Sequence, residues 1–138
     1  KNVSGFKDVY LKNGKIPNVG DRLFFPKLSN TFSSKTFDGS STNADTLMTV
    51  YTVPASTTTI VLGLSLCNLT ASAIEVNIEV TKNSGDNVKV TKLAQIPGKS
   101  TLEVMTGNKY VLNTSDILKV KSSAANSLDS TLSIMEIT

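Results

Sequence analysis

The amino-acid sequence predicts an all-β protein: an antiparallel β-sandwich or jelly-roll-like domain of seven or eight strands, with an extended N-terminal arm. Three observations support this fold class. Ser, Thr and Asn together make up a third of the 138 residues, a composition typical of β domains and unlike that of helical bundles. Short apolar runs alternate with turn signals at intervals of about 8–14 residues. No stretch of ten residues holds a helical period.

The arm is predicted over residues 1–45 and the sandwich over residues 46–138, because composition and charge change between them. All five Phe residues lie in the first 37 positions, and the first 45 carry seven basic against four acidic side chains. The remaining residues carry seven of each, so the whole net charge of +3 belongs to the arm. Gly and Pro interrupt the arm every few residues, which leaves only short extended pieces, at residues 9–11 and 21–25.

The aromatic side chains of the arm allow more than one interpretation. Disordered tails are poor in aromatic residues. The rings could therefore lie on the chain's own sandwich and complete its core, or they could dock into a neighbouring subunit; plain disorder is the third possibility. Docking on a partner makes the following arm residues the candidate partner-binding site: Phe6, Tyr10, Arg22, Phe24, Phe25, Phe32 and Phe37.

Three strands are predicted in the first half of the sandwich, at residues 46–53, 59–69 and 73–81. The second is apolar on both faces, so we expect a central strand covered on both sides. One of its faces carries Ile60, Leu62, Leu64 and Leu66. The third alternates, with Ile74, Val76, Ile78 and Val80 facing inward and Glu75, Asn77 and Glu79 outward.

A hairpin loop at residues 83–86 leads into a returning strand at residues 88–93. Val88 and Val90 are expected to face inward, and Lys89 and Lys92 outward. Two glutamates precede the turn and two lysines follow it. Opposite charges are therefore expected to pair across these strands, each pair contributing a few tenths to about 1 kcal/mol.

Four further strands complete the predicted domain. They lie at residues 101–106, 109–112, 117–121 and 128–137, after turns at residues 97–99, 107–108, 113–116 and 122–127. The turn residue Asp116, like Asp86 in the hairpin loop, is expected to bond the backbone.

Catalytic, cofactor-binding and metal-binding residues are not predicted, and the chain is not expected to be an enzyme. It has no His, which excludes His-based acid–base catalysis, a Ser–His–Asp triad and His metal sites. The single Cys67 excludes an intramolecular disulfide and is expected to be buried and structural. The spacing of Asn83, Asp86 and Asn87 matches no EF-hand loop. Glu75, Glu79 and Glu103 are expected on solvated strand faces.

Several classes of partner are also not expected. The lysines are dispersed rather than clustered, so nucleic-acid binding is not predicted. No apolar run approaches the roughly 20 residues needed to cross a bilayer. No small-molecule substrate is predicted either. A carbohydrate-binding face normally offers exposed aromatic rings, and the sandwich region has only Tyr51 and Tyr110.

Five sequence motifs, in order, resemble a family of small bacteriophage virion proteins. The first motif reads Val-Tyr-Thr-Val-Pro-Ala at residues 50–55 and continues at residues 58–68 with a Thr-rich turn and an apolar strand ending in Cys-Asn. A Thr/Ala-rich turn and an alternating strand follow at 69–76, then an Ile-Pro turn at 96–101, a strand entry at 110–120 and a closing Glu-Ile at 134–137. Ser56 and Thr57 depart from the family, which often has Gly-Lys there. The resemblance covers residues 49–137 and leaves residues 1–48 unmatched.

The resemblance implies a structural role and brings no catalytic residues with it. It implies assembly in multiple copies in the tail, neck or baseplate of a virion, in contact with other virion proteins and with copies of itself. A capsid decoration protein of the same fold, located on the capsid surface, is an alternative. A carbohydrate-binding surface module is another.

Overall fold

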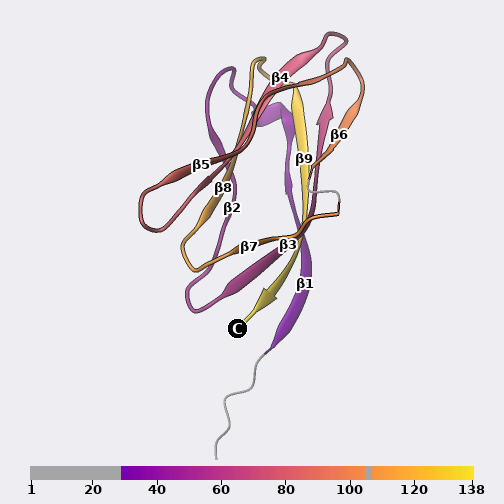
Figure 1. The fold of residues 1–138 in the computed structure, drawn as a ribbon. Helices are drawn as coiled ribbons and strands as arrows, with labels where there is room; N and C mark the ends of the chain where they lie inside the picture. The colour runs from indigo at the N-terminus through magenta and orange to yellow at the C-terminus, as the bar shows by residue number, and fades with distance from the viewer. Residues whose placement is uncertain (1–28, 105–106) are drawn as a thin grey trace, which may run out of the picture.

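The computed structural model describes residues 29–104 and 107–138 of the chain (Figure 1). The candidate site residues Phe6, Tyr10, Arg22, Phe24 and Phe25 and the two short extended pieces expected upstream lie outside the described residues. Within them, no helix is long and apolar enough to cross a membrane.

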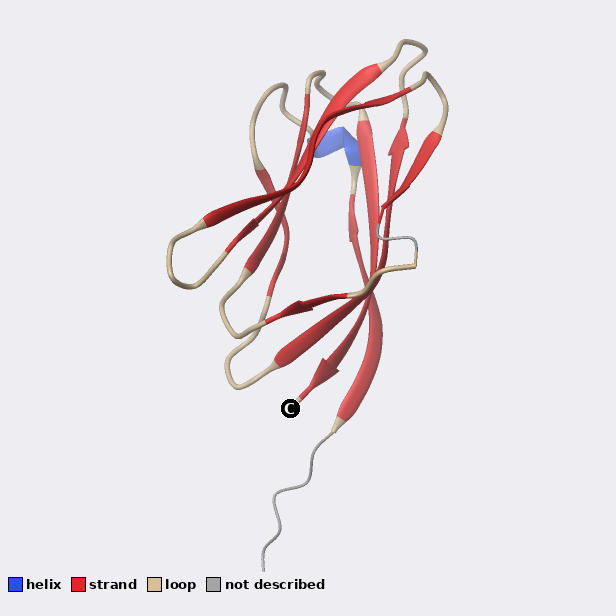
Figure 2. Ribbon diagram, in the orientation of Figure 1, coloured by secondary structure: helices blue, strands red, loops and turns tan. Residues whose placement is uncertain are grey.

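The described chain is all-β, as the sequence predicts, with one short 3-10 turn, η2, at Gly39–Ser41 (Figure 2). Its strands are β1 (Asn30–Phe37), β2 (Met48–Thr52), β3 (Thr58–Asn68), β4 (Ile74–Thr81), β5 (Asn87–Ile96), β6 (Thr101–Val104), β7 (Tyr110–Leu112), β8 (Ile117–Ser122) and β9 (Leu128–Ile137). The eight strands predicted after residue 45 are confirmed in type and place as β2 to β9. Only β5 runs clearly further than expected, to Ile96.

Two antiparallel sheets form the sandwich. The five-stranded sheet has the order β1-β9-β3-β6, with β7 also pairing with β3, and the four-stranded sheet has the order β2-β8-β4-β5. Alternate side chains of both sheets meet between them, because successive residues of a strand point to opposite faces. The buried core consists of Tyr51 and aliphatic side chains, among them Leu64, Leu66, Ile78, Leu118, Leu128, Leu132 and Ile134.

Strand β1 lies within the segment that the sequence assigns to the arm. All eight of its residues pair with β9, from Asn30 opposite Ile137 to Phe37 opposite Ser130. Six of the eight are exposed, because β1 is an edge strand with a polar sequence. This is why no apolar alternation marks it in the sequence. The segment upstream of residue 29, where an arm separate from the sandwich is expected, stays a prediction.

A β-bulge divides β3 into two halves of opposite orientation. The register with β9 shifts between Val61 and Gly63, so Leu62 is an extra residue. Val61 and Leu64 are therefore both buried, whereas Ile60 and Leu62 lie half-buried on the outer face. The expectation of one apolar face from Ile60 to Leu66 is wrong for this reason. The central position of β3 is confirmed, but among the described residues its outer face is not covered.

The hairpin of β4 and β5 confirms one predicted ion pair and corrects three predicted exposures. Lys89 donates to Glu79 across the strands, as expected. Glu79 and Asn77 are nevertheless buried, since Glu79 lies between Lys89 and Lys119 in the register and Asn77 binds the β5 bulge at Leu93. Val88 is 51% exposed, because it belongs to an edge strand.

The second expected ion pair is absent from the described hairpin. Glu75 pairs in the register with Gln95 rather than with a lysine. The two register shifts between β4 and β5 place Lys92 at a bulge, away from the glutamates.

Candidate interaction surface

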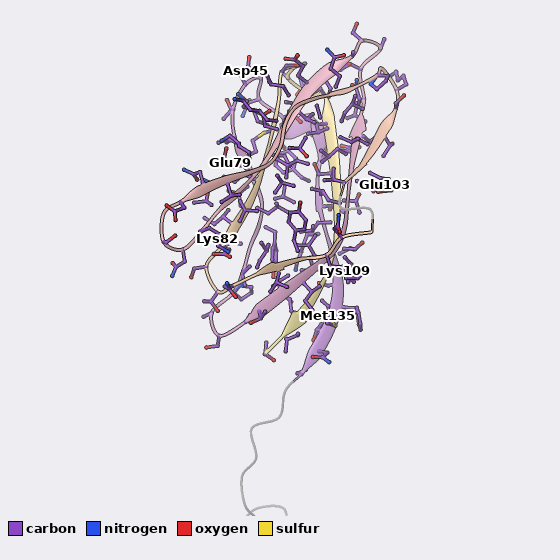
Figure 3. All side chains as sticks on the ribbon, viewed as in Figure 1. Asp45, Glu79, Lys82, Glu103, Lys109 and Met135 are labelled. Carbon is purple, nitrogen blue, oxygen red and sulfur yellow. The ribbon has the colours of Figure 1, made fainter. Side chains whose placement is uncertain are left out.

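The two outer faces of the sandwich differ in chemistry. On the four-stranded sheet, the outward side chains include charges of both signs: Glu75, Glu79, Lys89, Lys119 and Lys121. On the five-stranded sheet, the outward strand residues include only two charged side chains, Glu103 and Asp129. In Figure 3, Glu79 and Lys82 lie toward one side of the molecule, and Glu103 and Met135 toward the other.

An apolar row crosses the outer face of the five-stranded sheet. Phe32 of β1 is paired with Met135 of β9, Met135 with Ile60 of β3, and Ile60 with Val111 of β7. Paired residues of neighbouring strands share a face, so these four side chains lie side by side. Phe32 is 69% and Val111 56% exposed, and the two between them are half-buried. We call these four residues the apolar row.

Small polar side chains continue this face beyond the row. Ser34 and Ser133 are paired across β1 and β9, and Thr36 and Thr131 follow one step further along the same strands. Ser65 is paired with Glu103 and donates a hydrogen bond to its carboxylate, at 2.7 Å to Oε2. A sheet face with few charges and one apolar row is the kind of surface that protein partners cover.

The two described residues of the predicted site, Phe32 and Phe37, lie on opposite faces of β1. Phe37 is paired with the buried Ser130 and is half-buried on the inner side. Phe32 points outward and is the most exposed large apolar side chain of the described residues. The sandwich thus partly buries Phe37, whereas Phe32 lies beside Met135, Ile60 and Val111. These three residues are not among the candidates predicted from the sequence. No local signal marks those three, because the pairing of distant strands brings them together.

A cavity of about 350 Å³ opens between the edges of the two sheets, where β5 faces β6 and β7. Polar and apolar groups both line it, and Glu103 is the charged residue among the lining residues: Val90, Thr91, Ala94, Leu102, Glu103, Val104, Asn108 and Tyr110. This places Tyr110 at a concave surface.

Tyr51, the other aromatic residue considered for glycan binding, is buried. Its hydroxyl lies 2.8 Å from Thr59 Oγ1 and donates to Glu136 at 2.5 Å. Burial and the bond to Glu136 raise the pKa of Tyr51 to about 12. Since only 6% of the residue is exposed, its ring offers no platform for a sugar.

The carboxylate of Asp116 joins two backbone segments. It accepts hydrogen bonds from the backbone N–H of Asn83 and Asn113, as expected for a turn aspartate, and from Lys82 Nζ at 2.5 Å. Burial by itself would raise the pKa of Asp116, but these hydrogen bonds outweigh burial, so the pKa is lowered. The arrangement is a structural latch between the β4–β5 hairpin and the loop before β8.

The hairpin residues weighed as a calcium site bond to their neighbours instead. Asp86 accepts from Ser84 Oγ, and Asn87 accepts from Thr81 Oγ1. Residues 29–104 and 107–138 contain no group of three or more Cys, Asp or Glu placed to hold a metal ion.

Cys67 is half-exposed rather than buried. It lies on the outer face of β3, opposite Thr101 and Asp129. The expectation of burial is wrong because it assumed that both faces of β3 are covered.

No family model and no curated protein matches this chain. Among solved structures, a protein of the Bacillus endospore appendages, described as disulfide-linked pili, is 12% identical with a TM-score of 0.48, over 80% of this chain and 86% of that one. A protein of the acidic stable capsid of a Helicobacter pylori bacteriophage is 12% identical with a TM-score of 0.45, over 81% of this chain and 92% of that one. A protein of the virus-like particle of the extra small virus of the prawn Macrobrachium rosenbergii is 9% identical with a TM-score of 0.46, over 99% of this chain and 95% of that one. At these values the likenesses assign neither a family nor a function to this chain.

Proposed function

We propose that this chain is a non-enzymatic structural subunit of a bacteriophage virion that assembles in many copies through protein–protein contacts. The observation that carries the proposal is the apolar row, from Phe32 to Val111, on a sheet face with few charges. Contiguous apolar side chains on a protein surface mark interaction sites, because covering them removes apolar area from water.

The sequence resemblance to small virion proteins supports the class of assembly. It spans residues 49–137, which correspond to most of the sandwich, and it favours the tail, neck or baseplate. A decoration protein on the capsid surface would use the same fold and the same outer face. Labelling the protein in intact virions and imaging its position by electron microscopy distinguishes these two locations.

Self-association of the full-length chain tests the proposal. We expect light scattering to show a mass that rises with concentration, and Val111→Lys to weaken the association at least about tenfold, because burying an unpaired charge in an interface is costly. Val111 is 56% exposed, so the fold tolerates this change. Thr52→Lys, at an exposed position on the outer face of the other sheet, is the matched control and is expected to associate like the wild type.

Two results would overturn the proposal. One is a chain that stays monomeric at every concentration. The other is a Val111→Lys variant that associates as strongly as the Thr52→Lys control, since this would place the contact away from the apolar row.

A further inference from the structure

We infer that residues 22–26 of one copy, Arg-Leu-Phe-Phe-Pro, dock on the apolar row of a neighbouring copy. This inference rests on the proposed function and specifies the contact that carries assembly. We call residues 22–26 the aromatic segment. In this contact Leu23 and Phe25, which point to the same side of an extended segment, would cover Phe32, Met135, Ile60 and Val111.

The upstream chain joins the sandwich at the same end of the five-stranded sheet as the apolar row. Ser29 and Thr138 exchange two backbone hydrogen bonds, of 3.2 and 3.0 Å, which continue the β1–β9 ladder to the end of the chain. Phe32 is three residues further along. The 28 residues before Ser29 are therefore attached at the end of the sheet that carries the apolar row.

The sequence between the aromatic segment and β1 favours an extended connection, which leads away from the chain's own sheet. Phe25 precedes Pro26, and the residue before a proline is biased toward extended backbone. No glycine lies between Gly20 and Gly39, so the connection lacks the residue that most readily reverses a chain. If these four residues are extended, Phe25 would lie roughly 13 Å beyond Ser29. Such a connection would hold the aromatic segment away from the chain's own row and leave it free to reach the row of a neighbouring copy.

The dimensions of the row and of the segment agree. Four strands span about 14 Å across the three gaps between them, and five extended residues span about 16 Å. One aromatic segment therefore covers the row from Phe32 to Val111 in a single crossing.

The chemistry of the two surfaces is complementary. Aromatic rings pack favourably on Met and on other aromatic rings, which Met135 and Phe32 provide. The charges also match, since residues 1–28 carry six basic against two acidic side chains, and the outward strand residues of the five-stranded sheet carry Glu103 and Asp129. Arg22 begins the aromatic segment and Lys27 follows it, so both would bring positive charge to the sheet face that carries these two carboxylates.

Disulfide trapping between two full-length variants tests the inference. Both carry Cys67→Ser; one also carries Leu23→Cys, which leaves both Phe rings in place, and the other carries Ser133→Cys, an exposed position beside Met135 on the outer face. The variants are mixed, one of them isotope-labelled, and oxidised with glutathione disulfide. We expect mass spectrometry to find the mixed disulfide between positions 23 and 133 of different copies.

Two controls define the specificity of trapping. Thr52→Cys in place of Ser133→Cys puts the thiol on the outer face of the other sheet, and trapping there should fall at least about fivefold. Adding Phe24→Ser and Phe25→Ser to the Leu23→Cys variant should reduce trapping at position 133 to the same level, because the rings provide the apolar contact.

The remaining outcomes separate this inference from the proposed function. A chain carrying both Leu23→Cys and Ser133→Cys that forms only a disulfide within one copy would overturn docking on a neighbour. Equal trapping at positions 52 and 133, or no trapping in a chain that still self-associates, would also overturn it and leave the proposed function standing. A chain that neither self-associates nor traps overturns both.

Discussion

At the scale of single residues, the buried carboxylate of Asp116 accepts three hydrogen bonds. Its side chain is 1% exposed and accepts from two backbone N–H groups and from Lys82. Removing an acceptor from buried donors leaves them unsatisfied, which costs more than an ordinary hydrogen bond contributes. The same contacts keep the carboxylate ionised in the folded state, so stability depends on pH through this residue.

Asp116→Asn is expected to lower the free energy of unfolding at pH 7 by about 1.5–3 kcal/mol, since hydrogen bonds to a charged group are lost. The pKa of Asp116 is lowered in the folded state, so its contribution is present above the unfolded value near 3.8 and is lost as pH falls through the folded value. The difference between wild type and variant should therefore shrink below about pH 4. Urea unfolding of both proteins at several pH values measures this difference in stability.

The exposed Asp86 of the same hairpin provides the matched control. It makes one side-chain hydrogen bond, to Ser84, so Asp86→Asn should change stability by less than about 0.5 kcal/mol. Two results would contradict this account. One is a loss of unfolding free energy in Asp86→Asn as large as that in Asp116→Asn. The other is a stability difference between wild type and Asp116→Asn that stays undiminished at pH 2.

At the scale of elements, the connection between β5 and β6 links the two sheets through close backbone contact. The turn after β5 packs on the loop after β3: Lys99 N–H donates to the Thr70 carbonyl, and the buried Asn68 Nδ2 donates to the carbonyls of Ser72, Ile96 and Pro97. A Cβ added at Gly98 would lie 2.1 Å from the carbonyl oxygen of Ala71. Glycine is required here because the two backbones touch.

Gly98→Ala is expected to destabilise the protein by about 2–4 kcal/mol, because backbone atoms on both sides of the contact must move. Gly63→Ala is the control, since a Cβ there meets no atom within 4 Å, and its effect should stay within about 0.5 kcal/mol. Thermal or urea unfolding of both variants measures the difference. Equal stability of the Gly98→Ala and Gly63→Ala variants would contradict this prediction, since it would show that the backbone at Ala71 moves aside at no cost in free energy.

At the scale of the whole molecule, charge and apolar surface are distributed unevenly. Glu79 of the four-stranded sheet lies between two lysines in the register, whereas the outward strand residues of the five-stranded sheet include the apolar row and two acidic side chains. The positive net charge belongs to the first 45 residues. One face therefore suits solvent, and the other suits a partner that brings apolar and basic groups together.

Because charge complementarity is part of the proposed contact, self-association should weaken several-fold as NaCl rises from about 50 to about 500 mM, where screening shortens the reach of exposed charges. Arg22→Gln should reduce this salt dependence, and Lys121→Gln, on the outer face of the other sheet, should leave it unchanged. Sedimentation velocity at several salt concentrations measures both. Association that does not respond to salt would show that the apolar contact alone sets the affinity.

The sequence predicted the elements well where the signal is local. The alternation of Ile74, Val76, Ile78 and Val80 identified β4, and the turn residues around Gly85 and Pro97 placed the ends of β5 within a few residues. The candidate site was harder to predict from the sequence. Its aromatic residues stood out because they are rare, but only Phe32 of the two described rings lies on the outer face.

The sequence by itself determined the all-β class, the positions of β2 to β9 and the concentration of charge near the N-terminus, because alternation, turn chemistry and composition act over a few neighbouring residues. Only the tertiary structure decided that β1 joins the sheet and that Glu79 is buried. It also decided that the bulge at Leu62 exchanges the inward-facing and outward-facing positions of β3. It also aligned Phe32, Met135, Ile60 and Val111 into one row. The physical reason is register: hydrogen bonding between strands far apart in the chain sets which side chains become neighbours.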